Sequence, residues 1–221
     1  MPTPIPSDTD VEFDIIDVPS TSARGAGTQS DPIFPVPDGR QPAFDLSRAR
    51  DLETWKPAIA AYSQRHYAEA EWALRPTCIV LHFTAGRLFP WNLVKSDSFD
   101  GEVPGLASHY VIDGPHIWQL LPPEVRSRGA YGINHRAINI EMVAADAPDL
   151  ARRPATLQSC VALVRWLMAQ YGIPKERVYS HTAVSRMDVR EVPEALDLVD
   201  PRPYSKPDPG EQIMRAVRAS L

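Results

Sequence analysis

The stretch CIVLHFTAGR, residues 78–87, is an apolar run that ends on a histidine, a threonine and a turn of small residues. Five of its first six residues are apolar or favour strands, so the run predicts a buried strand that ends near His82. An imidazole in this position is either a core side chain with a satisfied hydrogen bond or a ligand or base at the mouth of a cleft. The rest of the chain decides between these two interpretations.

The same combination recurs later in the chain. The predicted strand RVYSH (177–181) also ends in a histidine, His181, and SKPDPG (205–210) places Lys206 and Asp208 just before a helix start. Strand ends form the clefts of sheets that are flanked by helices. Two histidines and a carboxylate are the ligand set of a catalytic Zn2+ with an open fourth position, because neutral imidazoles suit this cation and the carboxylate offsets its charge. These ligands lie too far apart in the chain for a short zinc motif.

Helical and strand patterns interleave along the chain. The helical patterns are 51–74, 91–97, 155–172 and 209–221, and the strand patterns are 77–83, 109–121 (a hairpin), 137–143 and 177–181. We therefore expect an α/β fold with a central mixed β-sheet flanked by helices. His66, in the first helix, is expected on the helix surface, and His116, beside the hairpin turn, is expected to be exposed.

The strand AINIEMV (137–143) carries an acidic residue among apolar ones. Its large apolar side chains alternate onto one face, so Glu141 and Asn139 share the other. A carboxylate in this setting is costly unless it is paired or functional. We therefore interpret Glu141 as functional, in preference to an exposed residue of an edge strand.

The first 45 residues differ in composition from the rest. They hold eight of the 23 prolines, and eight acidic residues against two arginines give them a charge of −6, whereas the whole chain carries −5. This segment predicts a disordered or loosely wrapped arm, in which only 11–18 is able to add an edge strand. The arm is either a solvated tail or an address that binds a delivery partner. Residues 46–221 then form one domain.

The composition excludes several classes of protein. No basic stripe or polybasic segment is present, so we expect no nucleic-acid or anionic-membrane partner. The longest apolar stretches are far short of a membrane span. The N-terminus has no secretory signal pattern, so we expect synthesis in the cytoplasm without a signal peptide. Cys78 and Cys160 lie in apolar patterns and are expected to be buried thiols.

Five motifs occur in one order: LHFTAG, SHYVID, AINIEMV, SHTAV and KPDPG. Together they resemble the zinc-dependent N-acetylmuramoyl-L-alanine amidases of the amidase-2 type, the superfamily of peptidoglycan recognition proteins and T7-lysozyme-like enzymes. The resemblance covers about residues 76–221. It implies a peptidoglycan-recognition-protein-like fold. It also implies hydrolysis of the amide bond between N-acetylmuramic acid and the L-alanine of the stem peptide, in peptidoglycan or muropeptides.

The resemblance also implies roles for single residues. His82, His181 and Asp208 match the zinc ligands, Glu141 matches a catalytic glutamate, and Lys206 matches a group that stabilises the transition state. The chemistry fits these roles. A carboxylate on the neighbouring strand is able to move a proton from the attacking water to the leaving amine. A lysine brings positive charge to the developing oxyanion.

The chain also departs from the family pattern. The segment of about 182–205 between His181 and Asp208 is longer than in the family, which indicates an inserted loop, either a wall over the substrate groove or decoration. This loop carries Asp188, the rival third ligand. Ser108 stands where T7-lysozyme-like members have a tyrosine, so a mechanism that uses that tyrosine is not available.

Other functions and several settings stay open. One alternative is a non-catalytic peptidoglycan-binding module of the same fold, although members that only bind typically lack a metal ligand. Another is a metal-free domain with two core histidines, which does not explain the ordered motifs. Three biological settings stay open: the chain acts as a cytoplasmic recycling enzyme, as a bacteriolytic phage endolysin, or as an effector delivered to the cell wall or periplasm. The stem-peptide preference and the oligomeric state stay open.

Overall fold

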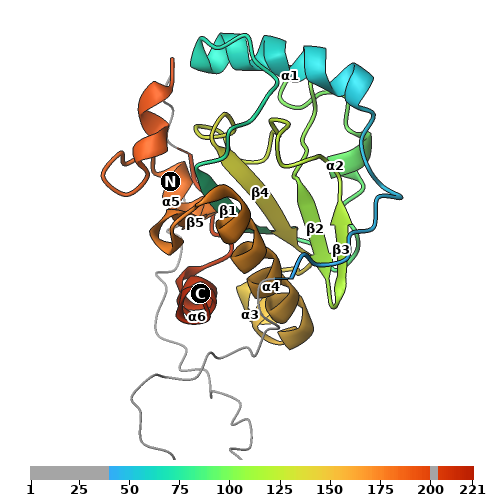
Figure 1. The fold of residues 1–221 in the computed structure, drawn as a ribbon, viewed down its shortest axis with the longest axis vertical. Coiled ribbons are helices and arrows are strands. Elements are labelled where there is room, and N and C mark those ends of the chain that lie inside the picture. The colour runs from blue at the N-terminus through green and yellow to red at the C-terminus, as the bar shows by residue number, and fades with distance from the viewer. Residues whose placement is uncertain (1–39, 200–203) are drawn as a thin grey trace, which may run out of the picture. The chain divides into compact units, whose positions relative to one another are not determined.

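One mixed sheet organises the part of the chain that the computed structural model describes, residues 40–199 and 204–221 (Figure 1). Its strands are β1 Cys78–Phe83, β2 Tyr110–Asp113, β3 His116–Gln119, β4 Ala137–Met142 and β5 Val178–Ser180. The order across the sheet is β3-β2-β4-β1-β5, with β2 and β3 antiparallel and the other neighbours parallel. The predicted mixed sheet flanked by helices is therefore confirmed. The predicted edge strand at 11–18 lies outside the described residues.

The helices cover both faces of this sheet. They are α1 Leu52–Tyr67, α2 Asn92–Lys95, α3 Ala147–Ala151, α4 Pro154–Tyr171, α5 His181–Ser185 and α6 Glu211–Ala219, with short 3₁₀ helices at Lys175–Arg177 and Pro193–Asp197. In Figure 1, α3, α4 and α6 lie over one face of the sheet, and α1 runs across the top of the view. Among the described residues no helix is both long and apolar enough to cross a membrane.

The main core lies between the sheet and the α3–α4–α6 layer. Strand side chains that alternate onto this face meet the apolar stripe of α4, as the sequence pattern predicts. The fully buried strand residues of this core include Ile79, Leu81, Ile138, Ile140 and Met142. Cys160 of α4 belongs to the same core, and both Cys78 and Cys160 are buried free thiols, as expected.

The opposite face of the sheet holds smaller clusters and the polar residues of interest. Val184 of α5 packs near Val80 of β1, and Leu93 of α2 packs near Val111 of β2. Between these clusters β1 and β4 present His82 and Glu141 as register partners. Because β4 has neighbours on both sides, the alternative of an exposed edge-strand glutamate is wrong.

Helix α1 is shorter than its pattern predicts. It begins at the N-cap Asp51, whose side chain accepts a hydrogen bond from the Glu53 N–H, and it ends at Tyr67. Ala68 then adopts a left-handed conformation with φ of 55°, which terminates the helix. The following residues run extended, because the Leu74 N–H pairs with a backbone carbonyl and Glu69 pairs with two arginines.

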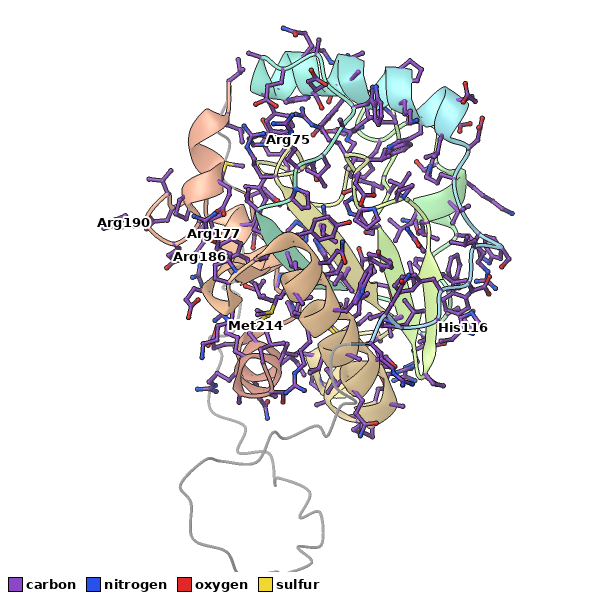
Figure 2. The ribbon with its side chains drawn as sticks, in the orientation of Figure 1. Arg75, His116, Arg177, Arg186, Arg190 and Met214 are labelled. Atoms are coloured by element: carbon purple, nitrogen blue, oxygen red, sulfur yellow. The ribbon has the colours of Figure 1, made fainter. Side chains whose placement is uncertain are left out.

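Three local predictions are corrected or confirmed. His66 is not on the helix surface: it is 9% exposed, and its Nε2 lies 3.0 Å from the Glu102 carboxylate. His116 is exposed as expected, at the end of the hairpin (Figure 2). The segment predicted as an inserted loop contains α5 and the 3₁₀ helix Pro193–Asp197, so it is partly helical.

The first described residues lie along β3. The Asp45 N–H donates to the Ile117 carbonyl and the Asp45 carbonyl accepts from the Gln119 N–H, at 2.9 and 3.0 Å. The Asp45 carboxylate lies 2.8 Å from His116 Nε2. This pairing covers part of the edge that β3 would otherwise present to solvent.

Candidate metal centre and active site

Three predicted ligands meet at the carboxyl-terminal edge of β1 and β5. His82 is the next-to-last residue of β1, and His181 follows β5 directly as the first residue of α5. Because these strands are parallel neighbours, their ends lie at the same edge of the sheet. Asp208 joins them from the segment before α6, where its carbonyl accepts a hydrogen bond from the Thr182 N–H at 3.0 Å.

The donor atoms of this group are close together and buried. One atom from each residue lies within 4.8 Å of the other two. His82 Nδ1 is 2.9 Å from His181 Nδ1, and these nitrogens are 3.3 and 3.2 Å from Asp208 Oδ2. All three side chains are almost completely shielded from solvent.

The outer nitrogen of each imidazole faces a hydrogen-bond acceptor. The Asn139 Nδ2 group donates to Ser127 Oγ at 2.8 Å, and Asn139 Oδ1 lies 2.9 Å from His82 Nε2. On the other side, the Tyr204 hydroxyl lies 3.0 Å from His181 Nε2. When both rings are neutral with hydrogen on Nε2, both Nδ1 lone pairs point into the centre.

This geometry fits a cation. Two Nδ1 lone pairs and a carboxylate oxygen converge within hydrogen-bond distance, and lone pairs in such contact repel unless a positive charge lies between them. Two imidazoles, each with a polar partner at its outer nitrogen, and one carboxylate are a donor set that suits zinc.

The pKa shifts of His82, His181 and Asp208 are consistent with a site for positive charge. Burial, followed by the charge of His82, lowers the pKa of His181 to about 4. Burial works against protonation of His82 as well, yet the contact with Asp208 raises the pKa of His82. Burial opposes ionisation of Asp208, but the two histidines hold its pKa far below its usual value. The two histidines therefore differ in their preference for a proton, because the pKa of His82 is raised whereas that of His181 is lowered.

Glu141 lies beside the centre on the neighbouring strand. It is the register partner of His82 on one side and of Val111 on the other, so it leaves the sheet on the same face as His82. Its Oε2 is buried and has no hydrogen-bond partner among the described residues. Burial raises the pKa of Glu141, although the nearby His82 opposes this change. A buried, unpaired carboxylate oxygen next to a cation site is suited to accept a proton.

Lys206 supplies a cation at the rim of the site. Its side chain is exposed, and it precedes the buried Asp208 by two residues. Its charge acts on both Glu141 and His181, because it lowers the pKa of each. The ammonium group is therefore close enough to favour negative charge that develops near the centre.

The rival ligand Asp188 lies elsewhere. Its carboxylate binds Arg190 through the backbone N–H, Nε and Nη2 at 2.9, 3.0 and 2.6 Å. These hydrogen bonds lower the pKa of Asp188 to about 2. Among the described residues, the group able to hold a metal contains Asp208 and not Asp188.

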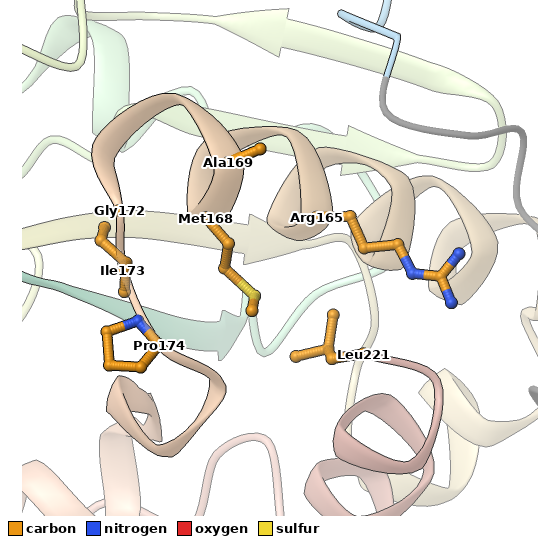
Figure 3. A pocket seen from close by; sticks show the side chains of 7 residues that line it. All are labelled: Arg165, Met168, Ala169, Gly172, Ile173, Pro174 and Leu221. Atoms are coloured by element: carbon orange, nitrogen blue, oxygen red, sulfur yellow. The ribbon is translucent and has the colours of Figure 1, made fainter.

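Two residues of the site were not predicted as such. Asn139 shares the Glu141 face of β4, so the strand alternation carried a signal for it. Tyr204 lies in the segment that was interpreted as an insertion, and nothing in the local sequence connects it with His181. A hollow of about 650 Å³ between α4 and the C-terminal residue (Figure 3) involves none of the predicted site residues.

The comparison with protein-family models assigns the chain to a family. The model described as N-acetylmuramoyl-L-alanine amidase, Amidase_2, matches residues 72–211, which is more than half of the chain. The chain belongs to this family, so the resemblance seen in the five motifs is confirmed. A search among curated proteins finds no match.

Several solved structures are similar to this chain. An endolysin N-acetylmuramoyl-L-alanine amidase, LysCS of Clostridium intestinale URNW, is 26% identical with a TM-score of 0.43, over 51% of this chain and 77% of that chain. The amidase AmiD of E. coli, solved with anhydro-N-acetylmuramic acid-L-Ala-D-gamma-Glu-L-Lys, is 22% identical with a TM-score of 0.45, over 65% and 58%. A mutant endolysin from Bacillus subtilis is 18% identical with a TM-score of 0.47, over 65% and 87%.

Proposed function

We propose that this chain is a zinc-dependent N-acetylmuramoyl-L-alanine amidase. It hydrolyses the amide bond between N-acetylmuramic acid and the L-alanine of the stem peptide, in peptidoglycan or muropeptides. The observation that carries the proposal is the convergence of His82 Nδ1, His181 Nδ1 and Asp208 Oδ2 on one point beside Glu141. Membership of the amidase family supports the same reaction.

The three converging residues would hold the zinc ion. The chemistry that zinc supplies when bound is polarisation of a carbonyl oxygen and activation of water at neutral pH. The chain itself supplies the orientation of the ligands, since Asn139 and Tyr204 hold the outer nitrogens of His82 and His181. The burial of all three ligands excludes competing water from their side of the centre.

Glu141 and Lys206 would carry the remaining steps. The unpaired Glu141 Oε2 takes a proton from the attacking water and gives it to the amine nitrogen of L-alanine as the amide bond breaks. Its raised pKa makes it a stronger base than an exposed carboxylate. Lys206 stabilises the negative charge that develops on the former carbonyl oxygen. The products are the sugar carboxylate and a free stem peptide.

The test is a digest of purified peptidoglycan, read by mass spectrometry. We expect free stem peptides that begin with L-alanine, their loss after chelation and their return with added zinc. His181→Ala should abolish the product, whereas an exposed control such as His116→Ala should leave it unchanged. The opposite result is that the protein binds wall material and zinc but cuts no amide bond. In that case the chain is a peptidoglycan-binding module and the roles of Glu141 and Lys206 are wrong.

The same assay addresses where the enzyme acts. A recycling enzyme should prefer soluble muropeptides, whereas an endolysin-like bacteriolytic enzyme or a delivered effector should digest intact sacculi. We propose that residues 46–221 carry the activity and that the acidic arm, 1–45, binds a delivery partner. The test uses a chain that lacks residues 1–39, which keeps the pairing of Asp45 with β3. Equal cleavage of sacculi by this chain, together with normal delivery, would contradict the second half of this proposal.

A further inference from the structure

Tyr204 connects the long segment after α5 to the metal centre. Its hydroxyl lies 3.0 Å from His181 Nε2 and donates a hydrogen bond to the Tyr131 carbonyl, also at 3.0 Å. Its ring meets the His181 ring edge-on, with centroids 5.6 Å apart. Its backbone N–H donates to the Ser185 carbonyl at 3.0 Å, so α5 itself holds the residue in place. The side chain is therefore fixed at both ends.

The single hydrogen of the Tyr204 hydroxyl determines which ring nitrogen of His181 carries hydrogen. A phenol has one hydrogen, and the Tyr131 carbonyl is only able to accept, so the Tyr204 hydrogen is used there. The hydroxyl oxygen is then left to accept the hydrogen of His181 Nε2. A neutral His181 with hydrogen on Nε2 has its lone pair on Nδ1, which is the atom that faces His82 and Asp208.

We infer that Tyr204 is a positioning residue, which fixes the tautomer and ring orientation in which His181 presents Nδ1 to a metal ion. This inference rests on the proposed zinc function and extends it to the segment between His181 and Asp208. That segment is neither decoration nor only a wall over the groove, because it supplies the outer hydrogen bond of one ligand. Outer hydrogen bonds of this kind raise ligand basicity and restrict ring rotation.

The first test compares the zinc affinity of Tyr204→Phe with that of the unmodified chain, by competition with a chromophoric chelator. We expect binding to weaken by about 10- to 100-fold. The matched control is Tyr171→Phe, which removes a hydroxyl that binds Glu124 at the end of α4. It should leave the zinc affinity unchanged. Thermal unfolding of the metal-free proteins shows whether the Tyr204 variant folds like its parent.

The second test needs no variant. Long-range ¹H–¹⁵N correlation spectra of the histidine rings, recorded on the zinc-loaded chain, should show His181 with hydrogen on Nε2 and a nitrogen shift typical of metal ligation on Nδ1. Hydrogen on Nδ1 would overturn the inference even if Tyr204→Phe failed to fold.

The outcomes separate the inference from the proposed function. If the unmodified chain binds no zinc, the proposed function fails, and with it the premise for Tyr204. If it binds zinc and Tyr204→Phe binds equally well, the function stands and the role of Tyr204 is wrong. Weaker zinc binding by Tyr204→Phe, with unchanged zinc binding by Tyr171→Phe, supports both the proposed function and the role of Tyr204.

Discussion

His82 and Glu141 are register partners on the adjacent parallel strands β1 and β4, and both side chains leave the sheet on the same face. Neighbouring strands lie about 4.8 Å apart, so the sheet itself sets the spacing between the candidate proton carrier and the first candidate metal ligand. Neither residue depends on a loop for its position. The remaining candidate ligands, His181 and Asp208, reach this pair from α5 and from the segment before α6.

The first prediction concerns the proton carrier. Glu141→Gln keeps the size and burial of the side chain but removes its ability to accept a proton. We expect amide hydrolysis to fall by about 100- to 10,000-fold, because general acid–base catalysis contributes a factor of this size. Zinc affinity should change little, since Glu141 is not among the converging donors. Stem-peptide release and zinc binding are measured on the same preparation.

The control for this prediction is Glu176→Gln, an exposed change of the same chemistry in the 3₁₀ helix after α4. Its activity should match that of the unmodified chain. An active Glu141→Gln enzyme would show that another group moves the proton.

The second prediction separates the two rival ligands. Asp208→Asn removes a charged donor from the centre, so zinc affinity should fall by more than about 100-fold. Asp188→Asn makes the same change in a carboxylate that binds Arg190, and its zinc affinity should stay unchanged. The measurement is competition with a chelator of known affinity. The reverse order of the two variants would assign the third ligand to Asp188.

The third prediction concerns the core beneath the site. Leu81 is fully buried in β1, and Leu81→Ala should lower the free energy of unfolding by about 2–5 kcal/mol, because it leaves a cavity in the main core. Leu88 is 83% exposed, so Leu88→Ala should change stability by less than about 0.5 kcal/mol. Urea unfolding of the metal-free proteins measures both. Equal losses would show that β1 does not lie in the centre of the fold.

The fourth prediction is a pH dependence at the edge of β3. Hydrogen bonds from the Ser47 hydroxyl and N–H, and then from His116, lower the pKa of Asp45 from 3.8 to about 2. A carboxyl whose pKa is lowered on folding stabilises the native state above its unfolded pKa, and the contribution is lost as pH falls through the folded value. Asp45→Asn should therefore be less stable than the parent at pH 5–7, with a difference that shrinks below about pH 4.

This difference should be nearly gone at about pH 2, where Asp45 takes up its proton in the folded chain. Urea unfolding at a series of pH values measures it, and the other carboxylates cancel because both proteins contain them. A difference that is independent of pH would show that the charge of Asp45 contributes nothing.

The sheet was predictable from the sequence because strand signals are local, whereas the roles of the candidate site residues came from the resemblance to a family. Strand alternation places Glu141 opposite the apolar residues of β4, and the apolar run before His82 identifies β1 as buried. The end of α1 was not predictable in the same way, because Ala68 leaves the helix through a left-handed conformation that alanine rarely adopts. Helices α3 and α5 have only five residues each, too few for a helical period to appear.

The failures at polar residues have a different cause. His66 has the spacing of an amphipathic helix, but its burial depends on Glu102, which comes from a loop far along the chain. Tyr204 binds His181 only because the segment between them folds back to α5. Such partners are set by tertiary structure, and the sequence around each residue carries no trace of them. The order of the five motifs was enough to identify the family. The pairs His66–Glu102 and Tyr204–His181 could be found only in the folded structure.

The position of β1 between β4 and β5 makes the complete donor group a property of the assembled sheet. His82 is separated from His181 by 99 residues and His181 from Asp208 by 27, so any chain cut between them retains at most two of the three donors on one piece. Parallel pairing over such separations forms late, because the loop must close before the contacts form. A nascent, damaged or partly unfolded copy is therefore expected to lack the complete donor set, rather than to hold a weakened one.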